Sequence, residues 1–390
     1  MIVRQFLQWV RNAPAGERAE ATGALARAYL YSELSADDAA AAEGAMLMLL
    51  DDTSPLVRRA LADALAASPS APPAVVHALA ADQPQIAAPV LALSPLFVDA
   101  DLVDRVATGC PAVQAAIASR AALPCSVSAA IAEVGTGESC LILIENSGAD
   151  IAPLSIDRIV ERFGHLAAIR EPLLARDDLA AAARLTLVAK LSETLATFVT
   201  ARAWLAPERA QRVTREACEK ATIAVAADTP EEGVRPLIRH LCESGQLTAG
   251  LILRALLSGN VALFEEALAE LAEMPIARVS GVIYDGGFAS LRALFDKAGM
   301  PASTYPAFKA AIEAMREGGF VGDPRGAAQL KRRMIERVLT RCANDEFGET
   351  APLITLLHRF ATEAARDEAR HYCDGIVCGD VEAEQHSLAA

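Results

Sequence analysis

The sequence predicts an all-α protein in which short helical hairpins stack into a superhelix, followed by a second helical domain. Apolar pairs recur at near-constant intervals through the first half, which is typical of stacked helical units. The composition is 53% hydrophobic but only 5% aromatic, so small aliphatic residues must supply the core. Alanine is a strong helix former, whereas a sheet would use more Tyr, Phe, Thr and Trp.

The recurring feature is a pair of apolar residues four positions apart, which share one face of a helix. The pairs are Val57/Leu61, Ile86/Val90, Val113/Ile117, Cys140/Ile144 and Ile169/Leu173. Their first members are separated by 29, 27, 27 and 29 residues. A step of this size indicates an array in which no single unit can bury its apolar face alone.

The first elements follow from capping signals. Residues 1–50 are expected to form N-terminal helices that pack on the array, with Ser35 as an N-cap. The array is assigned to residues 51–193. Its first helix is expected to start with Ser54 as N-cap and Pro55 at the first helical position, where a missing N–H costs nothing. Each unit then reads as helix, turn, helix, turn, with helices of about three turns.

The remaining elements are longer or differently spaced. Alanine-rich segments on either side of Pro207 predict a helical hairpin or joint over residues 194–228. Residues 229–345 are expected to form the second helical domain. Residues 346–390 are expected to form a C-terminal helix and an acidic tail.

Several motifs in the array resemble a family of bacterial proteins catalogued as domain of unknown function 2336. The run Leu50-Asp51-Asp52 precedes Val57-Arg58-Arg59-Ala60-Leu61-Ala62, and further motifs follow in order: Ala88-Pro89-Val90-Leu91, Ser94-Pro95, Ile117-Ala118-Ser119-Arg120, Asn146 and Ala175-Arg176-Asp177-Asp178-Leu179. The resemblance covers roughly residues 45–345. It implies an α-α superhelix of HEAT-like helical hairpin repeats and carries no chemistry with it.

Charge and hydropathy restrict the partners. The formal net charge is −14 and the isoelectric point is near 5.0, so the surface repels phosphate backbones and anionic bilayers at long range, although a local basic patch would override this. No stretch approaches the ~20 apolar residues of a membrane span, and the N-terminus lacks the features of a signal peptide. We therefore expect a cytoplasmic protein with no membrane partner, and nucleic acid is disfavoured. The sequence is compatible with a homo-oligomer.

The cysteines and glycines give no cofactor or metal site. Eight scattered cysteines, several in apolar context, are typical of buried thiols in a reducing compartment. His371, Cys373 and Cys378 could ligate a metal, but the spacing is loose and no second cysteine pair follows, so a helix end with incidental thiols is favoured. The stretch Gly135–Ser139 lacks the Lys-Ser/Thr of a phosphate loop and is expected to be a turn.

Two arginines at equivalent positions of the array are candidate binding residues. Arg120 and Arg176 each follow the first member of their pair by seven positions. On one interpretation they bind an acidic peptide or an anionic ligand. On the other, which the general abundance of structural arginines favours, they cap helix carbonyls or pair with a neighbouring unit. If they bind a partner, Arg→Glu at both positions should abolish binding without lowering the melting temperature.

A basic helix near residue 335 is the second candidate site. It carries Lys331, Arg332, Arg333, Arg337 and Arg341, of which the last three are spaced by four and share a face. This helix could dock an acidic partner, a receiver-like domain or the acidic tail. The alternative is a solvated helix face.

No catalytic motif emerges, so the sequence predicts a protein that is not an enzyme. We expect an interaction or scaffold module that binds a peptide or partner protein on the concave face of the array, with a role in bacterial signalling as a fold-level analogy. The alternatives are a sensor of a small anionic ligand such as a nucleotide, and a HEAT-like enzyme acting on nucleic acid. A deep pocket lined by arginine would favour the sensor.

Overall fold

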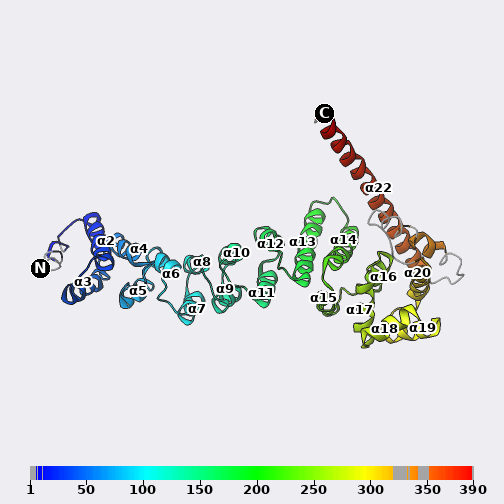
Figure 1. The fold of residues 1–390 in the computed structure, drawn as a ribbon, viewed down its shortest axis with the longest axis horizontal. Coiled ribbons are helices and arrows are strands. Elements are labelled where there is room, and N and C mark those ends of the chain that lie inside the picture. The colour runs from blue at the N-terminus through cyan, green and yellow to red at the C-terminus, as the bar shows by residue number, and fades with distance from the viewer. Residues whose placement is uncertain are drawn as a thin grey trace. The chain divides into compact units, whose positions relative to one another are not determined.

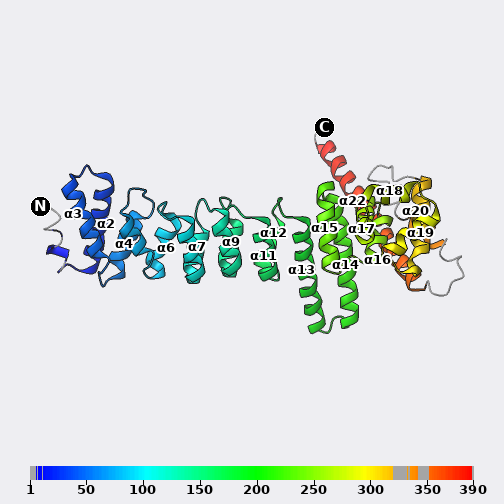
Figure 2. The same cartoon turned by 90° about the horizontal axis from the view of Figure 1, so that it is seen from below.

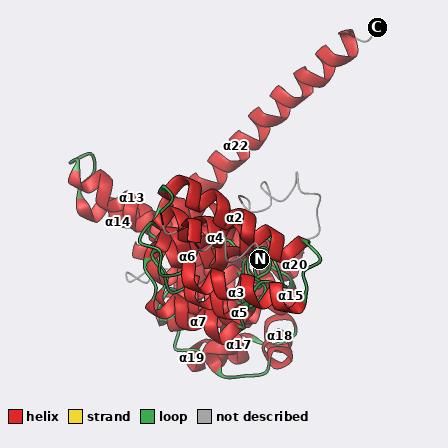
Figure 3. Ribbon diagram, turned by 90° about the vertical axis from the view of Figure 1, so that its left-hand side faces the viewer, coloured by secondary structure: helices red, strands yellow, loops and turns green. Residues whose placement is uncertain are grey.

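The protein is built from helices. The computed structural model describes residues 6, 8–10, 12–318, 332, 334–340 and 351–388. Within these residues every regular element is a helix (Figure 3), and pairing of the β type is limited to one isolated bridge between Leu123 and Ala149. The all-α prediction is therefore confirmed. None of the helices in the described part of the chain has the length and hydropathy to cross a bilayer.

The chain divides into two compact units, Met1–Leu191 and Ser192–Ala390, and the boundary falls inside a helix, α13. The finer division into five parts stays a prediction. The helices of the first unit (Figure 1) are α2 (Ala15–Tyr31), α3 (Ala36–Leu49), α4 (Pro55–Leu65), α5 (Pro73–Leu79), α6 (Pro84–Leu93), α7 (Asp99–Thr108), α8 (Pro111–Ala118), α9 (Cys125–Val134), α10 (Gly137–Glu145), α11 (Pro153–Phe163), α12 (Ala167–Leu174) and the start of α13 (Ala181–Ala201).

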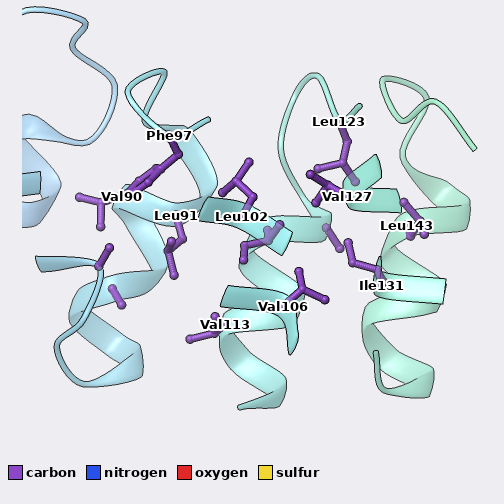
Figure 4. Close-up of a cluster of buried hydrophobic side chains, with 14 of the residues drawn as sticks. Val90, Leu91, Phe97, Leu102, Val106, Val113, Leu123, Val127, Ile131 and Leu143 are labelled. Atoms are coloured by element: carbon purple, nitrogen blue, oxygen red, sulfur yellow. The ribbon is translucent and has the colours of Figure 1, made fainter. Parts of the chain in front are cut away.

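Alternate helices of the first unit form two layers. In one layer α4 packs on α6, α6 on α8, α8 on α10 and α10 on α12; in the other, α7 packs on α9 and α9 on α11. The five apolar pairs all lie in the first layer, one in each of its helices, and all ten side chains are buried. The core lies between the layers, where Leu91 of α6, Val106 of α7 and Ile131 of α9 belong to one buried cluster (Figure 4).

Local sequence explains where these helices begin. Proline is the first residue of six of the described helices, among them α4, α6 and α8, where its fixed φ suits a helix start. The predicted Ser35 cap is confirmed, since its hydroxyl accepts from the Asp38 N–H at 3.1 Å. Ser54 stands at the N-cap of α4, but its side chain makes no capping bond. Its own N–H instead donates to the Asp52 carboxylate at 2.8 Å, which holds the chain upstream of the helix.

The second unit is also helical. After α13 come α14 (Pro207–Asp228), α15 (Glu231–Glu243), α16 (Ala249–Leu257), α17 (Val261–Ala272), α18 (Ile276–Tyr284), α19 (Phe288–Lys297), the 3-10 turn η1 (Ala302–Thr304), α20 (Tyr305–Gly318) and α22 (Ala351–Leu388). Helix α17 packs on α15, α16, α18 and α19. The ring centres of Phe295 and Phe308 lie 4.9 Å apart with the rings tilted by 57°, Phe308 stacks on Phe264 at 6.1 Å, and all three rings are buried. These aromatics supply the bulk that alanine cannot give this core.

Candidate functional site

Arg120 is held by the backbone of the preceding helix of its layer. It follows α8, and its two terminal nitrogens donate to the carbonyls of Leu91 at 2.6 Å and Ser94 at 2.8 Å, at the end of α6. The last carbonyls of a helix have no partner within it, so the guanidinium satisfies them. Burial lowers the pKa of Arg120 from its ordinary value. These contacts support the structural interpretation of this arginine.

Arg176 makes a related but weaker set of contacts. One nitrogen donates to the carbonyl of Ile144 in the last turn of α10 at 3.4 Å, and the other two bind the Asp178 carboxylate at 2.8 and 2.7 Å. The hydrogen bond between the two side chains raises the pKa of Arg176 and holds that of Asp178 below its ordinary value. Both predicted arginines thus already have partners within the chain, and an external anion would have to compete with them.

The other layer uses the same device, which the sequence analysis did not detect. Arg162 of α11 donates to the carbonyls of Ala132 at 2.6 Å and Gly135 at 2.8 Å, at the end of α9. Arg105 of α7 donates to the Ala80 carbonyl, the C-cap of α5, at 3.1 Å. In the sequence, these contacts could have been recognised from the spacing: each arginine lies about 25 to 30 residues after the end of the helix whose carbonyls it binds.

The helices of the first layer differ in the charge of their outer surfaces, since α4 carries the exposed Arg59–Asp63 pair whereas α6 and α8 carry no charge. Helices α6 and α8 contain no Asp, Glu, Lys, Arg or His, although 22% of the chain is Asp, Glu, Lys or Arg. We call the solvent-accessible residues that follow the first proline of each helix, together with the C-cap of α8, the uncharged face; these are Gln85, Ala88, Pro89, Ala92, Leu93, Ala112, Ala115, Ala116 and Ser119. On α10 the half-buried Leu141 and Ile142 occupy the corresponding positions between two glutamates.

The outer surface of the second layer carries ion pairs. Arg158 of α11 binds Glu133 of α9 at 2.8 Å and Glu161 at 2.5 Å, and Ser126 of α9 donates to Asp99 of α7 at 3.1 Å. Such exposed pairs are well solvated and contribute little each. Interface centres are depleted in charged residues, so the uncharged face is the better candidate for a partner's contact surface.

The basic helix is described only in part. Lys331, Arg333 and Arg341 lie outside the described residues. Arg332 binds Glu336 at 2.8 Å and Glu368 of α22 at 3.1 Å, and these hydrogen bonds raise its pKa. Arg337 is exposed, while Met334, Ile335 and Val338 are buried. The predicted basic surface therefore includes at least one arginine that already pairs with acidic groups of the chain.

A buried charge cluster in the second unit was missed by the sequence analysis. Arg254 of α16 is 5% exposed; its Nη1 donates to Glu363 of α22 at 2.5 Å and its Nε lies 3.5 Å from Glu219 of α14. Its guanidinium also lies 4.3 Å from the centre of the Phe360 ring. Lys220 bridges Glu363 and Asp367 at 3.7 and 2.9 Å. One charged residue within the apolar run 251–257 was the only signal in the sequence.

The surroundings of Glu219 raise the pKa of its carboxyl group. Burial raises the pKa of Glu219, Arg254 and Arg215 oppose that effect, and Glu363 adds to it, so the pKa stays above its ordinary value. A buried carboxylate with a raised pKa is a recurrent feature of functional sites and also of structural ion networks. Here every group in the cluster contacts another helix of the fold, which favours the structural role.

The other motifs give no ligand site within the described residues. Thr136 caps α10 by accepting from the Ser139 N–H at 3.3 Å, so the predicted turn is limited to Gly135 and Thr136, and Gly137–Ser139 begin the helix. Among the described residues, no group of three or more His, Cys, Asp or Glu side chains has metal-binding geometry. Burial raises the pKa of the Cys140 thiol to about 11, whereas Cys110, Cys242 and Cys373 are exposed, so the expectation of buried thiols holds only in part.

An open hollow near the N-terminus has an acidic and aromatic lining. Glu17, Glu20, Asp63, Trp9 and Tyr31 are among its residues, with Arg27 as its basic member. Neither Arg120 nor Arg176 lines it. Its charge does not suit the small anionic ligand of the sensor hypothesis.

Comparison with known proteins gives one match. The family model described as "Uncharacterised protein conserved in bacteria (DUF2336)" matches residues 86–347. The matched region begins later than the resemblance proposed from the motifs, so the Val57–Ala62 run lies outside it. No curated protein and no solved structure matches the chain.

Proposed function

Because the chain belongs to the DUF2336 family, whose description assigns no reaction, we propose from the geometry that it is a non-enzymatic interaction module. In this proposal the two layers of the first unit form a HEAT-like solenoid, and the protein acts in the cytoplasm of a bacterium. A rigid array presents side chains from successive helices, so a partner binds a preformed surface and less entropy is lost on binding.

The observation that carries the proposal is the uncharged face of α6 and α8. Apart from Gln85, its side chains are small or apolar, and they lie on neighbouring helices of one layer, which lets a partner helix or extended peptide approach closely. The charged groups of the flanking helices, such as Arg59 and Asp63 of α4 and Glu138 and Glu145 of α10, would form the polar rim that interfaces commonly have.

The test places charges on this face without disturbing the helices. Ala92→Lys and Ala116→Lys lie in the last turns of α6 and α8, where a cation suits the helix dipole. The matched control is Ala107→Lys with Ala129→Lys on exposed positions of α7 and α9, which makes the same charge change on the other layer. All three proteins should melt within about 2 °C of one another, because surface substitutions rarely change stability much.

The readout is quantitative affinity capture from native bacterial extract, followed by a direct binding measurement with the purified partner. We expect the wild type and the control to retain the same protein, and the face variant to lose it at least tenfold. Equal retention by all three proteins would place binding elsewhere and contradict the proposal.

The alternative of an anionic-ligand sensor makes a different prediction. Binding at Arg120 would require its guanidinium to leave the carbonyls of Leu91 and Ser94. A nucleotide that raises the melting temperature of the wild type but not of an Arg120→Lys variant would favour the sensor over the interaction module.

A further inference from the structure

The connected ends of α13 and α14 carry an exposed apolar and basic surface that the proposed function does not use. We define the hairpin tip as residues 195–215, which lie in the second unit. Figure 2 shows that these helix ends extend past α15, the next helix of that unit. We propose that the hairpin tip docks on an anionic lipid surface.

The extremity of the hairpin is apolar where loops are normally polar. The connection between Arg202 and Pro207 reads Ala-Trp-Leu-Ala, with Trp204 63% exposed. Behind it on the helices lie Leu195, Phe198 and Val213, whose side chains are each about half exposed. Exposed apolar groups gathered at one projecting end mark a contact surface, and Trp and Phe are side chains that favour the boundary between lipid and water.

The conformation of this loop is fixed by the backbone. Ala203 takes a left-handed φ of 55°, its N–H donates to the Thr200 carbonyl at 2.9 Å, and the Trp204 N–H donates to the Val199 carbonyl at 3.0 Å. The Trp204 ring meets Phe198 edge to face at 5.7 Å. Trp204 is therefore presented outward by a terminated helix and a packed neighbour, so its exposure is built into the fold.

Basic residues surround the apolar extremity. Residues 198–215 contain four arginines (Arg202, Arg209, Arg212 and Arg215) and one acidic residue, Glu208, in a chain whose net charge is −14. Arg202 lies 4.2 Å from the Phe198 ring centre and 5.5 Å from that of Trp204. Arginines one or two turns behind an inserted tryptophan stand at the level of lipid phosphates, whereas a second copy of the same tip would meet like charge.

This contact needs no membrane-spanning helix. The expectation of no membrane partner rested on the absence of a span and on the charge of the whole chain, and neither governs a surface contact made by one projecting end. Because the rest of the chain is acidic, docking requires anionic lipid and weakens as salt screens the arginines.

The first test is fluorescence of the full chain carrying Trp9→Phe, which leaves Trp204 as the only tryptophan. Vesicles of mixed phosphatidylcholine and phosphatidylglycerol should shift its emission to shorter wavelength and protect it from acrylamide. Vesicles of phosphatidylcholine alone should do neither, and high salt should reverse the shift. An unchanged emission with anionic vesicles at low salt would overturn the proposal.

The second test is co-sedimentation of matched variants with the anionic vesicles. Arg209→Glu with Arg212→Glu should weaken partitioning by well over tenfold, because each removed arginine alone accounts for about fivefold. Arg235→Glu with Arg239→Glu makes the same charge change at exposed positions of α15 and should have a much smaller effect. Phe198→Ala with Trp204→Ala should also lose binding, while Tyr31→Ala, an exposed aromatic of the first unit, should not.

Circular dichroism and sedimentation velocity accompany both tests, to show that the variants fold and to measure their oligomeric state. Tip variants that partition like the wild type would overturn the proposal. So would a dimer that is lost in the Phe198→Ala/Trp204→Ala protein without any vesicle binding by the wild type, because the tip would then serve a second copy.

Discussion

Arg120 in the first unit is half-buried and Arg254 in the second is buried, and they meet different acceptors. Arg120 donates to two neutral carbonyls at a helix end, whereas Arg254 stands between two carboxylates from different helices. The hydrogen bonds of Arg120 join consecutive helices of one layer, and its two acceptors precede it by 26 and 29 residues in the sequence. The hydrogen bond from Arg254 to Glu363 joins α16 to α22 across 109 residues. Arg120 is thus a local helix cap, as Arg316 of α20 is in the second unit, where it donates to carbonyls at the end of α18, whereas Arg254 connects distant helices.

The largest effect should come from Arg254→Ala. Removal of this side chain leaves Glu219 and Glu363 near each other without their common partner, and breaking a buried ion pair in this way costs about 3–5 kcal/mol. Chemical denaturation in the Trp9→Phe background follows the second unit through Trp204. Lys220→Ala, an exposed member of the same cluster, should cost about 1 kcal/mol or less.

A neutral replacement separates charge from packing in this cluster. Arg254→Met combined with Glu219→Gln and Glu363→Gln removes all three charges and should recover most of the stability lost by Arg254→Ala. If the triple variant is as unstable as the single variant, the packing of the Arg254 guanidinium on the Phe360 ring is the dominant contribution. Arg254 and Arg120 would then differ in how they pack more than in the charge of their acceptors.

The intermediate effect should come from Arg120→Ala. It leaves the carbonyls of Leu91 and Ser94 without their donors, which costs about 1–3 kcal/mol. Arg176→Ala should cost less, about 1 kcal/mol or below, because its carbonyl contact is longer and its carboxylate partner is exposed. Denaturation followed by Trp9 in a Trp204→Phe background measures the first unit.

Equal losses of unfolding free energy in Arg120→Ala and Arg176→Ala would contradict this order. If neither substitution lowers stability, both arginines are again candidates for binding a partner. These measurements therefore distinguish helix capping from partner binding, because a role restricted to partner binding predicts an unchanged melting temperature.

The sequence predicted the features of the fold that arise from residues repeated at a regular spacing. The five apolar pairs place one buried stripe in each of α4, α6, α8, α10 and α12, and proline marks most of these helix starts. It could not predict the Arg254 cluster, because periodicity does not say which distant carboxylates meet. The uncharged face was readable from the sequence of α6 and α8, but the outward direction of its residues becomes clear only when their layer is known.

The smallest effect concerns pH, and it has opposite signs in the two units. Asp178 has a pKa held below its ordinary value by Arg176, so its contribution to stability is present above the ordinary aspartate pKa and is lost as pH falls through the lowered value. Glu219 has a raised pKa, so the folded state binds its proton more tightly than the unfolded state does. Its burial therefore destabilises the second unit above the raised pKa, and this cost disappears as pH falls toward the ordinary glutamate value.

Glu219→Gln isolates this effect. The free energy of unfolding of the second unit, measured through Trp204, should rise in the wild type relative to the Glu219→Gln variant as pH is lowered from about 7 toward about 4.5. The first unit, measured through Trp9, should show no dependence on this substitution. A difference between wild type and variant that stays constant across this range would mean that Glu219 is charged throughout, with Arg254 outweighing its burial. The two units would then hold their carboxylates in the same way.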